Sequence, residues 1–170
     1  EAFGGMSVSS TGIQIFCACC LYPEPTAAAA QSDRPPELPN IEKLSACVSR
    51  VMGQNPSSFA LTGTCMYLVG TGAKRILIDA GEAKPGVLQN LISVMDREGC
   101  KSLDQIVLTH WHHDHILGVP ELLAHFGPVP VRKFLPSEGT EDGSLAKFDP
   151  NQFLKDVPIL GLVDGEVLRC

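Results

Sequence analysis

The chain has 170 residues, of which 44% are hydrophobic and 19% are charged, so its composition is that of a globular chain and not of a disordered one. Its formal net charge of -6 argues against a protein that wraps nucleic acid through charge alone, because that role needs clustered Lys and Arg. The same net charge still leaves room for a local basic groove.

The apolar run at residues 12–22 is too short to cross a membrane, since a spanning helix needs about 20 residues. We therefore predict no transmembrane helix and no membrane partner. Neither Lys nor Arg precedes Arg34, so the run lacks both the basic flank of a secretory signal and the Arg-rich face of a mitochondrial transit peptide. The residues themselves leave the targeting of the chain open.

Seven cysteines are an odd number without the regular spacing of a disulfide framework, and they favour a reducing compartment. Cys17, Cys19 and Cys20 form a C-x-C-C cluster that is a weak candidate for metal binding. Structural zinc sites usually show a C-x2-C pair with a second pair downstream, and this cluster has neither feature.

The composition divides the chain near residue 40. Residues 1–40 end in a stretch rich in Pro and Ala without a helical or strand period, which predicts a flexible leader or linker. Residues 41–170 are predicted to form an incomplete domain. It opens with apolar residues at 41–53 that indicate a strand and its flanks.

The next segments alternate between strands and helices. Residues 59–69 and 74–79 predict two strands of a hairpin, because the residues between them are rich in glycine. Residues 85–96 carry the apolar stripe of an amphipathic helix. Residues 103–109 predict a short buried strand, and residues 116–126 predict a helix that is closed by a Gly-Pro pair.

Residues 129–134 are another possible strand, and Asp164-Gly165 indicates a turn between two short strands. The order of strands and helices implies a mixed layer in which helices pack on one face of a sheet.

Four of the five histidines lie within residues 110–115, which read His-Trp-His-His-Asp-His at the end of the predicted buried strand. Imidazole and carboxylate groups are the usual ligands of catalytic zinc. The spacing lets His110 and His112 converge on one ion, with Asp114 and His115 at a neighbouring position. Two ions roughly 3.5 to 4 Å apart would hold a bridging water and lower its pKa, so the implied reaction is hydrolysis.

For four other side chains, the sequence indicates a metal-binding or catalytic role less strongly. His113, between two ligands, is expected to point away from the ions, and His125 is expected to have a structural role at a helix end. Trp111 is more readily packed under the metal loop than stacked on a substrate. Asp79 follows a predicted strand, where a turn residue is nearly as plausible as a functional one.

The pattern Thr-His-x-His-x-Asp-His at residues 109–115 is similar to the signature of the metallo-beta-lactamase superfamily. Segments 61–72, 75–82 and 105–115 resemble the beta-lactamase-like protein 2 group, whose members include a mitochondrial endoribonuclease acting on single-stranded RNA. The likeness covers residues 45–168. It implies an α+β fold, the αββα sandwich of that superfamily, truncated here to its N-terminal half.

The resemblance also implies roles for individual residues. The residues implied to bind one or two zinc ions are His110, His112, Asp114 and His115, with Asp114 also catalytic. Asp79 would support the metal loop from outside the ligand set. The implied substrate is single-stranded RNA, and the implied location is the mitochondrial matrix, with the cytosol as the alternative.

This chain departs from the family pattern in ways that bear on activity. The family has Asn-Thr where this chain has Cys65-Met66, and Gly where it has Leu117. The family also takes further His and Asp ligands from its C-terminal half, whereas no His follows His125 here. Each ion would then have two protein ligands, although a catalytic zinc normally has three. We therefore expect weak metal binding and little or no activity for this chain alone.

Two alternatives stay open at this stage. The first is a thioester hydrolase of the glyoxalase II or polyketide thioesterase type, because those relatives share the same signature. The second is a non-catalytic truncated product. A sandwich cut in half would also expose an apolar sheet face and a strand edge, which predicts possible self-association.

Overall fold

The structure is a computed structural model that describes residues 4–9, 12–17, 37–135, 149 and 151–169. Its strands are β1 (Gly4–Ser9), β2 (Gly12–Cys17), β3 (Ile41–Ser45), β4 (Val48–Met52), β5 (Cys65–Val69), β6 (Lys74–Ile78), β7 (Ser102–Leu108), β8 (Val131–Phe134), β9 (Ile159–Leu162) and β10 (Val167–Arg169). Its helices are α1 (Val87–Arg97), α2 (His113–Ile116), α3 (Val119–Phe126) and α4 (Asn151–Leu154).

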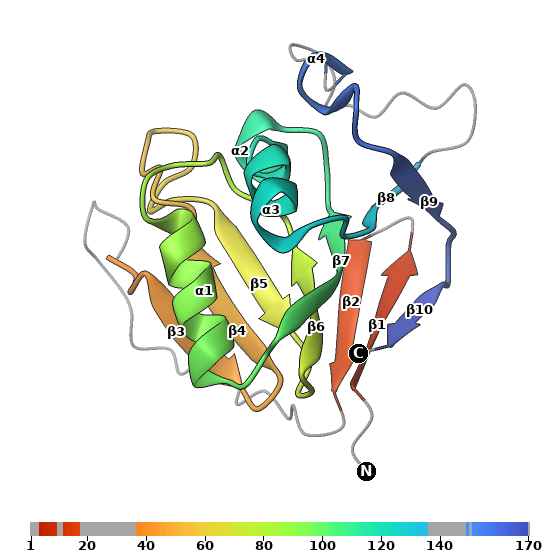
Figure 1. The fold of residues 1–170 in the computed structure, drawn as a ribbon, viewed down its shortest axis with the longest axis horizontal. Helices are drawn as coiled ribbons and strands as arrows, with labels where there is room; N and C mark the ends of the chain where they lie inside the picture. The colour runs from red at the N-terminus through yellow and green to blue at the C-terminus, as the bar shows by residue number, and fades with distance from the viewer. Residues whose placement is uncertain (1–3, 10–11, 18–36, 136–148, 150, 170) are drawn as a thin grey trace.

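A seven-stranded sheet in the order β3-β4-β5-β6-β7-β8-β9 forms the centre of the molecule (Figure 1). The strands β3 to β6 pair antiparallel, and β6 to β9 pair parallel. The predicted hairpin is confirmed by the antiparallel pairing of β5 with β6. Parallel pairing brings the carboxyl ends of β6 and β7 to the same edge of the sheet, and this edge carries the histidine cluster.

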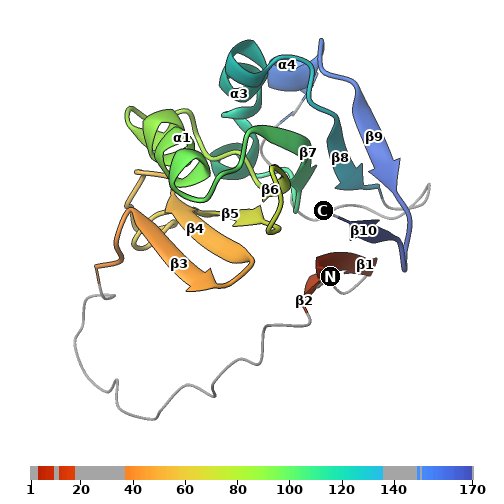
Figure 2. The same ribbon diagram turned by 60° about the horizontal axis from the view of Figure 1, so that its bottom comes forward.

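The helices α1 and α3 lie on one face of this sheet, as the two ribbon views show (Figures 1 and 2). On α1 the residues Val87, Leu91, Val94 and Met95 are buried, which confirms the amphipathic helix predicted at 85–96. They join a core cluster with buried side chains of the central strands, among them Leu77 of β6 and Ile106 of β7.

The other face of the sheet is covered as well. Here Ile76, Ile78 and Val107 are buried in a second cluster that includes Leu168 of β10. The strand β10 pairs with β1 in a small three-stranded sheet, which lies on the side away from α1 and α3 (Figure 2). This finding differs from the exposed apolar sheet face expected from the sequence. Self-association remains a prediction.

Several segments differ from the sequence expectations. Residues 41–53 form two strands, β3 and β4, because Ala46 and Cys47 make a turn between them. The strands β9 and β10 flank the expected Asp-Gly turn, yet they pair with β8 and β1 and not with each other.

The segment 1–40, predicted to be a flexible leader, contains β1 and β2, which pair with each other. The pairing of β1 with β10 brings together segments that are far apart in the sequence, and composition carries no signal for such contacts. Residues 18–36, with the predicted Pro and Ala stretch and with Cys19 and Cys20, lie outside the described residues. Within the described parts of the chain, none of the helices is long and apolar enough to span a membrane.

Candidate metal centre

The histidine cluster begins where β7 ends, and Asp79 lies next to it where the parallel strand β6 ends. Asp79 has a positive φ of 60°, a left-handed conformation that Asp tolerates better than most residues. Its backbone N–H still donates to the carbonyl of Val107, at 2.9 Å, so the turn stays attached to β7. This geometry directs the Asp79 carboxylate toward the loop that follows β7.

The structure brings the four predicted ligands together. His110 Nε2 lies 3.1 Å from His112 Nδ1, and the His110 and His115 ring centroids are 4.1 Å apart. His115 Nε2 lies 3.5 Å from Asp114 Oδ2. The side chains therefore form two adjacent pairs, as the spacing predicts.

Asp79 forms hydrogen bonds with the loop that follows β7. Its carboxylate accepts hydrogen bonds from the Thr109 backbone N–H at 2.9 Å and from the Thr109 hydroxyl. It also lies 2.7 Å from His115 Nδ1. Because a carboxylate only accepts, His115 Nδ1 carries a proton, and in the neutral ring Nε2 keeps the lone pair that a metal ion needs.

The hydroxyl of Thr109 lies 2.9 Å from His110 Nδ1, so Thr109 connects Asp79 to a second ligand. The histidine pattern at residues 109–115 contains this threonine but does not by itself indicate a role for it. Supporting contacts of this kind set the ring orientation of metal-binding histidines.

The electrostatics of the cluster favour the protonation states that metal ligands need at His110 and Asp114, whereas His115 is shifted toward its protonated form. Burial and the nearby charge of His115 lower the pKa of His110. Burial also acts to lower the pKa of His115, but the hydrogen bond and charge of Asp79 raise it above its ordinary value. Burial acts to raise the pKa of Asp114, whereas the hydrogen bond from Thr64 helps to bring it below its ordinary value. His110 therefore favours the neutral form and Asp114 the ionised form.

A tight backbone contact fixes the position of the loop on the sheet. The Ala80 N–H donates to the carbonyl of His115 at 2.8 Å, and the Gly118 N–H donates to the carbonyl of Gly81 at 3.0 Å. At Gly118 a Cβ atom would meet the Ala80 carbonyl oxygen at 1.9 Å. The helix predicted at 116–126 is accordingly divided into α2 and α3, with Gly118 between them.

The remaining residues near the cluster lie much as the sequence suggests. The His113 side chain is exposed, with Nε2 3.8 Å from Glu82 Oε1, and His125 stacks edge-on against Phe126. Trp111 packs against the main core cluster. The ammonium group of Lys133 lies 4.9 Å from the centre of the Trp111 ring.

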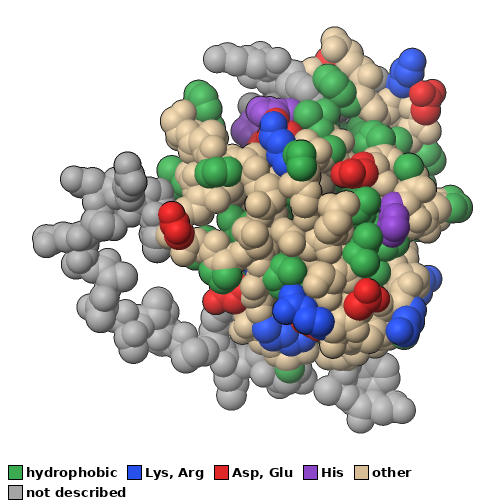
Figure 3. Space-filling view, turned by 60° about the vertical axis from the view of Figure 1, so that its left-hand side comes forward, with side chains coloured by type: hydrophobic (Ala, Val, Ile, Leu, Met, Phe, Trp, Pro, Cys, Tyr) green, Lys and Arg blue, Asp and Glu red, His purple; other side chains and the backbone are tan. Residues whose placement is uncertain are grey.

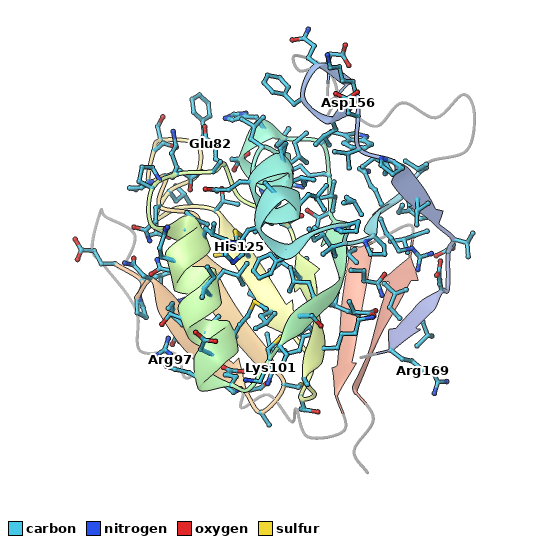
Figure 4. The ribbon with its side chains drawn as sticks, in the orientation of Figure 1. Glu82, Arg97, Lys101, His125, Asp156 and Arg169 are labelled. Atoms are coloured by element: carbon cyan, nitrogen blue, oxygen red, sulfur yellow. The ribbon has the colours of Figure 1, made fainter. Side chains whose placement is uncertain are left out.

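Three residues at the site had no signal in the sequence. Thr64, immediately before β5, donates a 2.5 Å hydrogen bond to Asp114, and Asn55 contacts both Thr64 and Glu82. Asn55 and Thr64 come from the loop between β4 and β5, and Glu82 comes from the loop that follows β6, so all three are far from the histidines in sequence. Figure 4 shows Glu82 at the end of the molecule opposite Arg97 and Lys101.

The space-filling view in Figure 3 shows histidine side chains gathered at the top of the molecule, beside hydrophobic and charged side chains. Imidazole nitrogens and a carboxylate are donors that suit zinc. Among the described residues, however, no group of three or more His, Cys, Asp or Glu side chains is placed to hold one ion. His110 and His112 therefore form one pair of candidate zinc ligands, and Asp114 and His115 form another. The ligand roles remain predictions.

The structure combines a mixed sheet, helices on one face of it, and a His and Asp cluster at the carboxyl ends of β6 and β7. Residues 61–133 match the family model of the metallo-beta-lactamase superfamily. This match includes the histidine cluster, and the chain has the α/β fold that the superfamily implies.

Two of the similar curated proteins are named as thioesterases. Thioesterase pkgB of Emericella nidulans is 45% identical over 112 residues, which are 65% of this chain and 33% of that protein. An atrochrysone carboxyl ACP thioesterase of Cryptosporiopsis sp. is 42% identical over 119 residues, which are 67% of this chain and 37% of that relative. Among solved structures, the DIM-1 metallo-beta-lactamase exposed to ceftazidime is 20% identical with a TM-score of 0.48, over 78% of this chain and 58% of that one.

The chain spans about a third of the length of the curated relatives that it matches. The superfamily predicted from the histidine pattern is the one whose model matches residues 61–133. The finer resemblance to the endoribonuclease group has no support from these relatives, whose names support the thioesterase alternative.

Proposed function

We propose that the chain supplies the metal-binding part of a metal-dependent hydrolase that cleaves thioesters. The observation that carries the proposal is the convergence of His110, His112, Asp114 and His115 at the end of β7, in a chain that is 45% identical to a thioesterase over 112 residues. The ligand roles and the substrate belong to the proposal.

The bond changes of this reaction are simple. The oxygen of water bonds to the acyl carbon, the carbon–sulfur bond breaks, and the departing sulfur takes up a proton. A bound zinc ion supplies Lewis acidity, which polarises a carbonyl group and lowers the pKa of water. Asp114 is the proposed catalytic residue, because its ionised carboxylate can orient a water molecule for attack.

The other residues prepare the site. Asp79 keeps the proton of His115 on Nδ1, so that Nε2 faces the site. Thr109 joins Asp79 to His110 and limits the rotation of that ring. These contacts set the direction of two histidines before any ligand arrives.

Two further observations favour a thioester over RNA. The loop between β4 and β5, whose Thr64 contacts Asp114, exposes the apolar side chains of Phe59 and Leu61, which suit an apolar acyl group. The basic side chains of Arg97 and Lys101 lie at the end of the molecule away from Glu82, which neighbours the site (Figure 4). Of the basic side chains nearer the site, Lys84 pairs with Glu82, and Lys133 is only 3% exposed. A basic groove at the site would be needed to bind RNA through its phosphates.

The test compares two substrates with the chain in zinc-containing buffer. One substrate is an acyl thioester of N-acetylcysteamine, with the released acid measured by chromatography, and the other is an end-labelled single-stranded RNA. We expect slow thioester hydrolysis that a His110→Ala variant loses, and intact RNA. Cleavage of RNA without thioester hydrolysis would favour the endoribonuclease hypothesis instead. Hydrolysis of neither substrate would favour the non-catalytic one.

A further inference from the structure

The loop between β4 and β5 contributes a buried threonine to the candidate metal centre. Thr64 is 5% exposed, and its hydroxyl oxygen lies 2.5 Å from Asp114 Oδ2. A carboxylate that is ionised can only accept, so the Thr64 hydroxyl donates this hydrogen bond. Hydrogen bonds to an ionised acceptor are shorter and stronger than neutral ones.

Asn55 sets the direction in which that hydroxyl donates. The Asn55 Oδ1 atom accepts the backbone N–H of Thr64 at 2.9 Å, and this contact identifies the oxygen side of the amide. The Nδ2 group therefore faces the Thr64 hydroxyl oxygen at 3.1 Å and a Glu82 oxygen at 3.3 Å. Because the hydroxyl oxygen already accepts from Asn55, its own proton is directed toward Asp114.

The backbone around these two residues is closed tightly. The Gly53 N–H donates to the carbonyl of Thr64 at 2.7 Å, which joins the two ends of the loop. A Cβ atom at Gly53 would lie 3.0 Å from Asn55 Oδ1 and 3.1 Å from the Thr64 carbonyl oxygen. Gly63, with a φ of 117°, adopts a conformation that a residue with a side chain rarely takes. The loop thus presents Thr64 to Asp114 from a fixed base.

We infer that Thr64 is a positioning residue for Asp114, and that Asn55 directs its hydroxyl. The hydrogen bond holds the carboxylate of Asp114 in one orientation beside His115, whose Nε2 lies 3.5 Å from the same oxygen. Loss of the hydroxyl frees this carboxylate to rotate, and ordering it on metal binding then costs conformational entropy. The inference rests on the proposed ligand role of Asp114 and not on the choice of substrate.

The test measures affinity for Co²⁺, from the visible absorption that appears when the ion binds, and needs no substrate. Thr64→Val keeps the branched shape and removes the hydroxyl, so we expect an affinity about 10-fold to 100-fold lower, the usual effect of removing a supporting contact. Thr64→Ser restores a hydroxyl and should recover most of the affinity. The Co²⁺ spectrum of Thr64→Val should also change, because the carboxylate that it no longer orients is a proposed ligand.

A double-variant comparison separates this role from a general effect on folding. In an Asp114→Asn background, Thr64→Val should cause little further loss of Co²⁺ affinity, because its partner is already altered. An equal loss in both backgrounds would overturn the inference, as would a chain that binds no Co²⁺. If Thr64→Val does not fold, Asn55→Ala provides the same comparison, with a smaller loss expected. Absence of thioester hydrolysis would count against the proposed function alone.

Discussion

Replacing Glu98 by alanine is expected to lower the free energy of unfolding by about 3 to 5 kcal/mol, as is usual when one partner of a buried ion pair is removed. Glu98 ends α1 and accepts from Arg75 of β6, Lys43 of β3 and Ser49 of β4. The Arg75 side chain is only 3% exposed, so Glu98→Ala leaves a buried positive charge without this carboxylate. Urea unfolding followed by circular dichroism measures the effect.

The same carboxylate makes this contribution depend on pH. Burial acts to raise the pKa of Glu98, but hydrogen bonds from Lys43, Ser49 and Arg75 bring it below its ordinary value. A lowered pKa in the folded state stabilises the protein above the unfolded-state pKa, and this stabilisation is lost as the pH falls through the folded-state value. The difference between wild type and Glu98→Ala should therefore be largest near neutral pH and shrink in acid.

The matched control is Asp104, which pairs with Lys74 at 2.8 Å while both side chains are substantially exposed. Solvent screens this pair, so Asp104→Ala should cost less than about 1 kcal/mol. Equal losses for the Glu98 and Asp104 variants would contradict the view that the buried network joins α1 to the sheet.

Replacing Gly118 by alanine is expected to destabilise the fold by about 3 kcal/mol, the upper end of the usual range for overpacking. The new methyl group would meet the backbone oxygen of Ala80 at 1.9 Å, and backbone cannot move aside as a flexible side chain can. The turn that would have to shift also contains Asp79, so metal affinity should fall together with stability. Urea unfolding and Co²⁺ titration of the same variant check both effects.

Gly161 on β9 provides the control, because a Cβ atom there would meet Leu135 at an ordinary 3.8 Å. Gly161→Ala should change stability by no more than about 0.5 kcal/mol. Unchanged stability and metal affinity in Gly118→Ala would show that the turn and the α2–α3 junction are not packed as tightly as described.

Local pattern was sufficient to predict the elements that support the site. The stripe of buried residues on α1, including Leu91 and Met95, repeats with the helical period, and the hairpin of β5 and β6 has a glycine-rich turn. The histidine spacing predicts which side chains converge because it follows a buried strand directly. These features depend on residues that are close in sequence.

Contacts between distant segments could not be predicted in this way. Thr64 and Asp114 are 50 positions apart, and neither residue type marks the other as its partner. The division of the predicted helix at Gly118 depends on Ala80, which comes from another strand end. Composition likewise gave no sign that β1 would pair with β10, since neither strand determines its partner locally.

If His110 and His112 begin a metal centre, the metal content of the chain should depend on these two side chains. The chain and a His110→Ala/His112→Ala double variant would be dialysed to equilibrium against dilute zinc and then measured by elemental analysis. Since the chain has seven cysteines that can also bind zinc, the comparison between the two proteins matters more than either value. We expect zinc in the chain and none in the double variant. No zinc in the chain, or equal amounts in both proteins, would contradict it.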